Sequence, residues 1–172
     1  MNEELRDILR QYCDLELTYG DDWVTNSAMW EVVYAIGEHG YGSEDIDTLP
    51  PKQRTIFPVL AMLSSVQCDG FLSIFYNDTL HEIKRLRQSI GVLGLDTIGN
   101  IFDEAFPLVQ SKFTWSDEHV NFCEQVGWET NPHTYFGREI VDRFEEWEKQ
   151  INDIFTSEEF EKHLESYLKS TK

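Results

Sequence analysis

The sequence predicts an all-α protein that forms a single compact domain of about eight helices over residues 1–172. Apolar residues recur at steps of three and four along most of the chain, which is the period of an amphipathic helix. Alternating apolar and polar runs between turn residues, the pattern of a strand, do not occur, and Gly and Pro fall between the helical stripes. A chain of 172 residues with 41% hydrophobic residues can bury one sizeable core.

The individual helices follow from apolar stripes, taken in chain order. The stripes run from Leu5 to Tyr12, Met29 to Ile36, Leu80 to Leu93, Ile98 to Ala105, Ile140 to Ile154 and Phe160 to Leu168. Residues 51–68 are also expected to be helical, with Pro58 starting or kinking that helix, and Pro107 is expected to end or kink the helix that carries Ala105. In the run TSEE, we expect Thr156 to cap the last helix because Glu159 follows three residues later.

Net charge is the strongest functional signal in the composition. Thirty-two Asp and Glu residues against fourteen Lys and Arg residues give a formal net charge of -18. Nucleic acid and anionic membrane surfaces carry charge of the same sign, so binding to either is unfavourable, and basic partners are favoured. We therefore expect a basic protein partner, with neither nucleic acid nor membrane as a direct ligand.

The carboxylates gather in particular segments. From Gln11 to Pro51 the chain has nine Asp and Glu residues and no Lys or Arg. Carboxylates three or four residues apart on a helix lie about 5–6 Å from one another at Cβ, so such a surface resembles a row of DNA phosphates. The candidate partner-binding carboxylates are Asp14, Glu16, Asp21, Asp22, Glu38, Glu44, Asp45 and Asp47. The many Glu residues of the C-terminal helices are interpreted as a solvated helix face.

Neither a catalytic site nor a metal site is expected. The chain lacks a His-Glu-x-x-His motif, a Gly-x-Ser-x-Gly elbow and a phosphate-binding Gly-rich loop followed by Lys. His119 with Cys123 and Glu159 with His163 are the two pairs that resemble metal ligands, and two ligands one helical turn apart do not complete a metal site. We therefore expect no enzyme activity, no metal and no cofactor.

The cytoplasm is the expected location. Three widely spaced cysteines fit reduced thiols better than a disulfide framework. No apolar run exceeds about five residues, whereas a membrane-spanning helix needs about 20. The N-terminal run MNEELRDILR lacks the apolar centre of a secretory signal.

The segment from Cys68 to Asn77, CDGFLSIFYN, resembles the signature Asn-Gly-Gly-Phe-x-Gln-Tyr-Phe-x-Asn of the bacterial DNA-mimic protein family, a domain family first catalogued without a function. Gly70, Phe71, Phe75 and Asn77 match at the right spacing, and the run from Ile90 to Ala105 is similar to the next part of the family pattern. The similarity extends over residues 61–105. Cys68, Asp69 and Ser73 depart from the signature.

The resemblance implies a role for the negative charge, because that family includes an acidic protein that occupies the DNA-binding site of a transcription regulator. We therefore expect a DNA mimic that binds a transcription regulator or nucleoid protein and competes with DNA. Since DNA-binding regulators are often two-fold dimers, a homodimer would match both half-sites. The alternative is an immunity or antitoxin protein that neutralises a basic nuclease or other toxin, with exposed Trp residues as anchors, and a small uncharacterised hydrolase ranks third.

The four matching residues are interpreted as a fold signature. Gly70 is expected to provide a tight backbone passage between two helices, while Phe71, Ile74 and Phe75 pack inward. Asn77 or Asp78 is expected to cap the helix that begins near Leu80.

Overall fold

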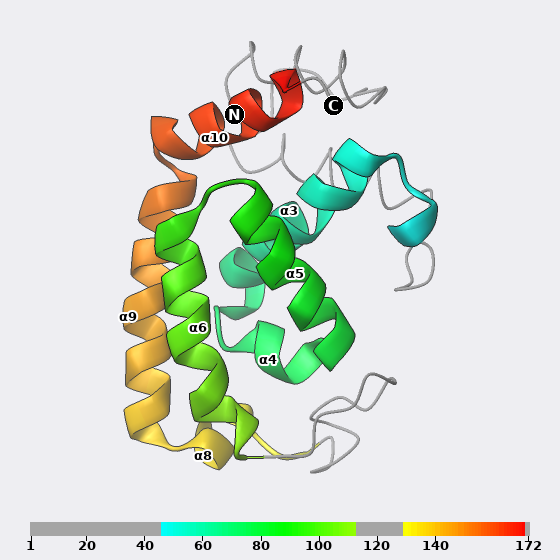
Figure 1. Cartoon of the computed structure of the whole chain (residues 1–172). Coiled ribbons are helices and arrows are strands. Elements are labelled where there is room, and N and C mark those ends of the chain that lie inside the picture. The colour runs from blue at the N-terminus through cyan, green and yellow to red at the C-terminus, as the bar shows by residue number, and fades with distance from the viewer. Residues whose placement is uncertain (1–45, 113–128, 171–172) are drawn as a thin grey trace.

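The computed structural model describes residues 46–112 and 129–170, and these residues form helices and no strand, which confirms the all-α fold class (Figure 1). They are the 3-10 helix η1 (Ile46–Thr48) and the α-helices α3 (Pro51–Asp69), α4 (Ser73–Asn77), α5 (Leu80–Val92), α6 (Asp96–Gln110), α8 (Pro132–Phe136), α9 (Arg138–Phe155) and α10 (Glu158–Lys169). The predicted stripes from Leu5 to Tyr12 and from Met29 to Ile36 lie outside the described residues, and the single domain over residues 1–172 stays a prediction.

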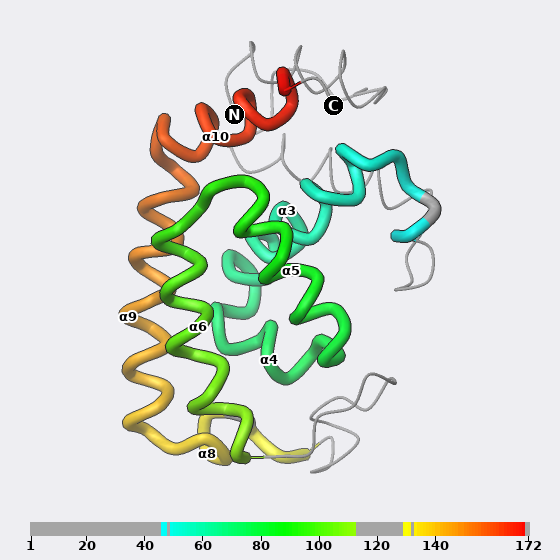
Figure 2. The backbone as a smooth tube through the Cα atoms, in the orientation of Figure 1, coloured from blue at the N-terminus to red at the C-terminus, as the bar shows by residue number. Residues whose placement is uncertain are grey.

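The helices pack around one shared core. Helices α6 and α9 lie side by side and antiparallel, and α10 crosses beyond the C-terminal end of α9 (Figures 1 and 2). Helix α3 contacts α4, α5 and α9, and α5 also contacts α6. Within the described residues, no helix is both long and apolar enough to cross a membrane.

Pro58 was expected to start or kink a helix and Pro107 to end or kink one, and both prolines lie inside helices. Helix α3 begins at Pro51 and continues through Pro58 to Asp69, and α6 continues through Pro107 to Gln110. Proline removes one backbone donor from a helix. Burial of Val109 beyond the second proline helps to keep α6 helical, because its apolar side chain is fully removed from water. Of the expected alternatives, a start of α3 at Pro58 and an end of α6 at Pro107 are therefore excluded.

Two helix caps also differ from the sequence-based expectation. The N-cap of α5 is Thr79, whose Oγ1 accepts the Glu82 N–H at 3.2 Å while Glu82 Oε2 accepts the Thr79 N–H at 2.7 Å. Asn77 is the last residue of α4 and Asp78 follows it, so neither caps α5. Thr79 occupies the N-cap position because Glu82, three residues later, completes a reciprocal capping box with it.

The cap of α10 lies one residue later than expected. Thr156 is the C-cap residue of α9, and its hydroxyl donates to the carbonyl oxygen of Asn152 at 2.9 Å. Ser157 is the N-cap residue of α10. The TSEE pattern thus located the helix break correctly and assigned the cap to the wrong neighbour.

Four phenylalanine rings form the centre of the core. Phe71 and Phe75 come from the segment around α4, Phe102 from α6 and Phe144 from α9, and all four are buried. The ring of Phe75 lies 5.4 Å from Phe71, 5.1 Å from Phe102 and 5.5 Å from Phe144, measured between centroids. Aromatic pairs at such distances add stabilisation beyond their buried area. The inward packing predicted for Phe71, Ile74 and Phe75 is confirmed.

Candidate functional site

The acidic surface predicted from the sequence lies mostly outside the described residues. This applies to seven of its eight carboxylates, which are Asp14, Glu16, Asp21, Asp22, Glu38, Glu44 and Asp45. His119 and Cys123 also lie outside the described residues. So do the four tryptophans considered as anchors, which are Trp23, Trp30, Trp115 and Trp128. The use of these residues by a partner stays a prediction.

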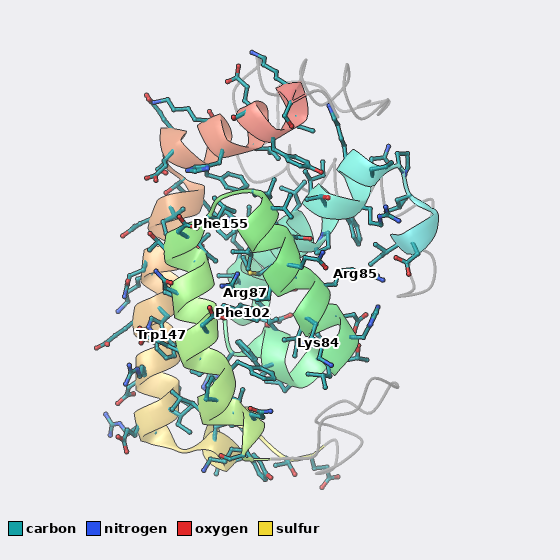
Figure 3. The ribbon with its side chains drawn as sticks, viewed as in Figure 1. Lys84, Arg85, Arg87, Phe102, Trp147 and Phe155 are labelled. Carbon is teal, nitrogen blue, oxygen red and sulfur yellow. The ribbon has the colours of Figure 1, made fainter. Side chains whose placement is uncertain are left out.

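Asp47, the eighth carboxylate, lies on η1 and forms an ion pair. Its side chain is 63% exposed, and Arg85 Nη2 on α5 donates to Asp47 Oδ1 at 3.0 Å and to Oδ2 at 3.1 Å. Figure 3 labels the side chain of Arg85. The two residues are 38 positions apart in the chain. Between Gln11 and Pro51 the chain contains no Lys or Arg, so only the packing of η1 near α5 reveals that Arg85 compensates this carboxylate.

A second acidic surface lies on α9. Its exposed carboxylates occur on the side opposite the buried residues Phe144, Trp147 and Ile151. Steps of three and four residues place side chains on one helix face, about 5–6 Å apart at Cβ. We call these residues the α9 carboxylate row, and they are Glu139, Asp142, Glu145, Glu146 and Asp153.

Ion pairs compensate only part of the acidic charge on α9 and its neighbours. Arg138 pairs with Asp142 at 3.6 Å within α9, and Arg143 pairs with Glu104 of α6 at 3.1 Å. Among the residues that the structure describes, no ion pair engages the other members of the row, Glu139, Glu145, Glu146 and Asp153. All five members of the row are exposed, and four of them form no ion pair within the described residues, so most of the charge of the row is uncompensated. This exposure agrees with the predicted solvated face.

Glu148 is different from the rest of the acidic residues on α9. Its Oε2 accepts the N–H of Phe71 at 3.1 Å, which joins α9 to the turn between α3 and α4. At that turn Gly70 has φ 83° and ψ 164°, a conformation that is essentially restricted to glycine. A Cβ at position 70 would also lie 2.8 Å from Glu148 Oε2. The sequence pattern predicted a solvated face for the Glu residues of the C-terminal helices, whereas the structure assigns Glu148 to the fold.

These contacts test the fold signature residue by residue. The tight passage predicted at Gly70 is confirmed by its positive φ and by the close carboxylate of Glu148. Phe71 and Phe75 are fully buried, whereas Asn77 is exposed at the end of α4. Two requirements of geometry, space for the carboxylate of Glu148 and a positive φ, thus explain the glycine at position 70.

Asp78 is the described carboxyl with the most perturbed proton affinity. Burial, and to a smaller extent the nearby charge of Glu82, raise its pKa to about 7. A carboxyl that titrates near neutral pH can act as a general acid or base when a substrate lies beside it. No group of three or more potential metal ligands occurs within residues 46–112 and 129–170.

A salt bridge between α5 and α6 lowers the pKa of a carboxyl group, which is opposite to the effect of burial on Asp78. Arg87 donates from Nε to Asp103 Oδ1 at 2.7 Å and from Nη2 to Oδ2 at 2.6 Å. This two-point hydrogen bond lowers the pKa of Asp103 and raises the pKa of Arg87. The pair therefore keeps both charges and contributes to the packing of the two helices, so we assign it to the scaffold.

His163 contacts the scaffold too. Its Nδ1 lies 3.0 Å from the carbonyl oxygen of Leu93, and its Nε2 lies 3.8 Å from Glu159. The contact with Leu93 joins α10 to the turn between α5 and α6. The pair of Glu159 and His163 is thus part of a helix contact, and the expectation that it does not form a metal site stays a prediction.

The comparisons with known proteins relate most of this structure to one family. A protein-family model described as DMP19-like protein matches residues 47–171. The match includes all of the 61–105 segment that carries the sequence signature, as well as α9 and α10. Searches of the curated proteins and of the solved structures gave no match.

Proposed function

Because the chain belongs to the DMP19-like protein family, we propose that it is an acidic DNA mimic. It would bind the DNA-binding face of a basic protein in the cytoplasm, a transcription regulator or a nucleoid protein, and would compete with DNA for that face. The observation that carries the proposal is the combination of this family membership with a net charge of -18. The proposed activity is binding and not catalysis.

The α9 carboxylate row supports this proposal from the described residues. The row extends over fifteen positions, from Glu139 to Asp153, and a helix rises about 1.5 Å per residue, so its length is about 21 Å. DNA presents phosphate charges along each strand at about 3.4 Å per base pair. A helix that displays unpaired carboxylates over this length can contact the basic surface of a DNA-binding protein at several points at once.

Rigidity is the second point in favour of α9. Its inner face is fixed by Phe144, Trp147 and Ile151, which are buried in the core. A helix held in this way presents its charges at fixed spacing. The backbone that carries them is already ordered in the folded chain, so binding loses less conformational entropy. Uncompensated charges that lie close together repel one another and destabilise the folded chain. Their presence on α9 therefore favours a role for the negative electrostatic field in binding.

The test is a pull-down from the source cell at low ionic strength, followed by stepwise elution with salt. We expect a DNA-binding protein to be retained and to elute as salt rises, because screening weakens interactions between exposed charges. The recovered protein is then bound to a labelled duplex, and the acidic chain should displace the duplex as its concentration rises. Retention that does not change with salt, or failure to displace DNA, would contradict the proposal.

A further inference from the structure

We infer that Glu104 of α6 and Trp147 of α9 hold Arg143 on the flank of α9, so that this cation does not neutralise the α9 carboxylate row. Glu104 is then a positioning residue, because it acts on the row through Arg143. The inference rests on the proposed function for its consequence in binding, and on contacts among described residues for its geometry.

The first step is the position of Arg143 along α9. It follows Glu139 by four residues and precedes Glu146 by three, and residues at these spacings are neighbours on a helix surface. A Glu four residues before a basic residue is also the favourable order for an ion pair. The spacing by itself therefore favours neutralisation of the row. Within the part of the chain that the structure describes, however, no ion pair joins Arg143 to Glu139 or Glu146.

The second step is that two contacts hold the guanidinium elsewhere. Arg143 Nη2 donates to Glu104 Oε2 at 3.1 Å, and the two residues are 39 positions apart in the chain. Arg143 Cζ lies 4.8 Å from the centroid of the Trp147 ring. A guanidinium can stack its face on an aromatic ring while the N–H groups at its edge donate to a carboxylate. Trp147 and Glu104 therefore hold different parts of the same group.

The third step is that the fold supplies both contacts, although the ion pair itself is exposed. Trp147 is only 6% exposed, and its ring lies 5.3 Å from that of Phe144, measured between centroids. Helices α6 and α9 contact each other, which brings Glu104 beside Arg143. The side chains of Glu104 and Arg143 are 59% and 54% exposed. Since an exposed ion pair is weak, a change at Glu104 can release Arg143 without unfolding the chain.

The fourth step is the effect of such a release on the charge of the row. Without Glu104, Arg143 keeps only its contact with Trp147, and Glu139 and Glu146 remain within its reach along the helix. An ion pair with either of these two carboxylates would reduce the negative field that the row presents to a basic partner. Loss of Glu104, which is not a member of the row, should therefore weaken binding through the row.

The placement of Arg143 is tested on the isolated full chain by NMR. Protons held over the face of a tryptophan ring resonate upfield, so the Arg143 Hδ resonances report the contact with Trp147. We expect this upfield shift to become smaller in Glu104→Ala. It should not change in Glu158→Ala, which removes a carboxylate that pairs with Lys162 on α10. An unchanged shift in Glu104→Ala would show that Glu104 does not hold Arg143, which overturns the inference.

The consequence for binding is tested with two probes, the basic protein that the wild-type chain retains at low salt and a deca-arginine peptide. We expect Glu104→Ala to bind each probe roughly two- to fivefold more weakly than the control Glu158→Ala. The same two changes are then compared in chains that carry Arg143→Met, which keeps an apolar stem over Trp147 and removes the cation. In these chains Glu104→Ala and Glu158→Ala should bind equally.

This comparison separates positioning from direct contact. If Glu104 contacts the partner itself, its removal weakens binding by the same factor with and without Arg143→Met, and that result overturns the inference. If the wild-type chain retains no basic protein, the proposed function fails, whereas the NMR measurement and the peptide still decide the role of Glu104.

Discussion

Two regions of the molecule differ in how they use charge. Residues 46–95, which contain η1 and α3 to α5, have four Asp and Glu residues and five Lys and Arg residues. Residues 138–169, which contain α9 and α10, have ten Asp and Glu residues and five Lys and Arg residues. The first region is close to neutral, and the second carries much of the negative charge of the described residues.

The difference teaches that scaffold and candidate interaction surface are separated on the molecule. In the first region, α3 contacts three other helices and buries residues on most of its sides. In the second region, α9 buries one face and exposes carboxylates on the other. Changes in the first region should therefore act on stability, and changes on the outside of α9 should act on binding.

The largest expected effect is at the aromatic centre of the scaffold. Phe75→Ala should lower the free energy of unfolding by about 3–5 kcal/mol, because it leaves a cavity among rings that the structure packs tightly. Denaturation with urea, followed by circular dichroism, measures this change. Val92→Ala, at a side chain that is 52% exposed, is the matched control and should change stability by less than about 0.5 kcal/mol. Equal losses in the two variants would contradict the assignment of Phe75 to the core.

The next effect is expected where the two regions meet. Gly70→Ala should cost about 2–4 kcal/mol, because alanine is strained at this backbone conformation and its Cβ displaces the carboxylate of Glu148. Gly91→Ala is the control, since a Cβ there would lie 3.5 Å from Arg87 Nη1, an ordinary contact. Folded Gly70→Ala should still bind a partner. Loss of binding by a fully folded variant would show that this turn has a direct role in recognition.

A smaller effect on stability should depend on pH. The pKa of Asp78 is about 7 in the folded chain because of burial and Glu82, whereas an unfolded Asp has a pKa near 3.9. Between these values the folded chain holds more protons than the unfolded chain, so stability falls as pH rises from about 4 to about 7. Asp78→Asn removes this pH-dependent loss of stability. Its free energy of unfolding should therefore exceed that of the parent by about 2 kcal/mol at pH 8.

Thermal unfolding at several pH values measures this effect of Asp78→Asn. At pH 3 the parent and the variant should have similar stability, because the carboxyl of the parent is then protonated in both folded and unfolded states. Asp153→Asn, at an exposed position of α9, controls for the removal of one negative charge. Parallel curves of stability against pH for the parent and Asp78→Asn would contradict the role of burial.

The smallest effect on stability should accompany a change in binding. Replacing Glu145 and Glu146 by Gln should change the free energy of unfolding by less than about 0.5 kcal/mol, because both side chains are exposed. Binding of a basic partner should weaken by roughly two- to fivefold for each carboxylate removed and should depend less steeply on salt. Lys149→Gln on the same helix should not weaken binding. Unchanged binding by the double variant would remove the α9 carboxylate row from the candidate surface.

Much of the fold could be predicted from local patterns. The buried residues Ile98, Ile101, Phe102 and Ala105 of α6 are those of the predicted stripe, because helical periodicity is a property of the sequence itself. In α9 the pattern was shifted at its ends, since Val141 and Phe155 are buried whereas Ile140 and Ile154 are only partly buried. The caps at Thr79 and Ser157 were missed by one or two residues, because several neighbouring polar residues can cap a helix and the backbone geometry selects one of them.

The sequence by itself determined the helical class, the family, the excess of negative charge and the amphipathic pattern of α9. Only the tertiary structure decided which carboxylates are available, because Asp47 meets Arg85 from 38 positions away and Glu148 meets the N–H of Phe71 from 77 positions away. Burial likewise set the pKa of Asp78. The physical reason is that the periodicity and the charge of a segment are local properties, whereas desolvation and ion pairing depend on the elements that folding brings alongside it.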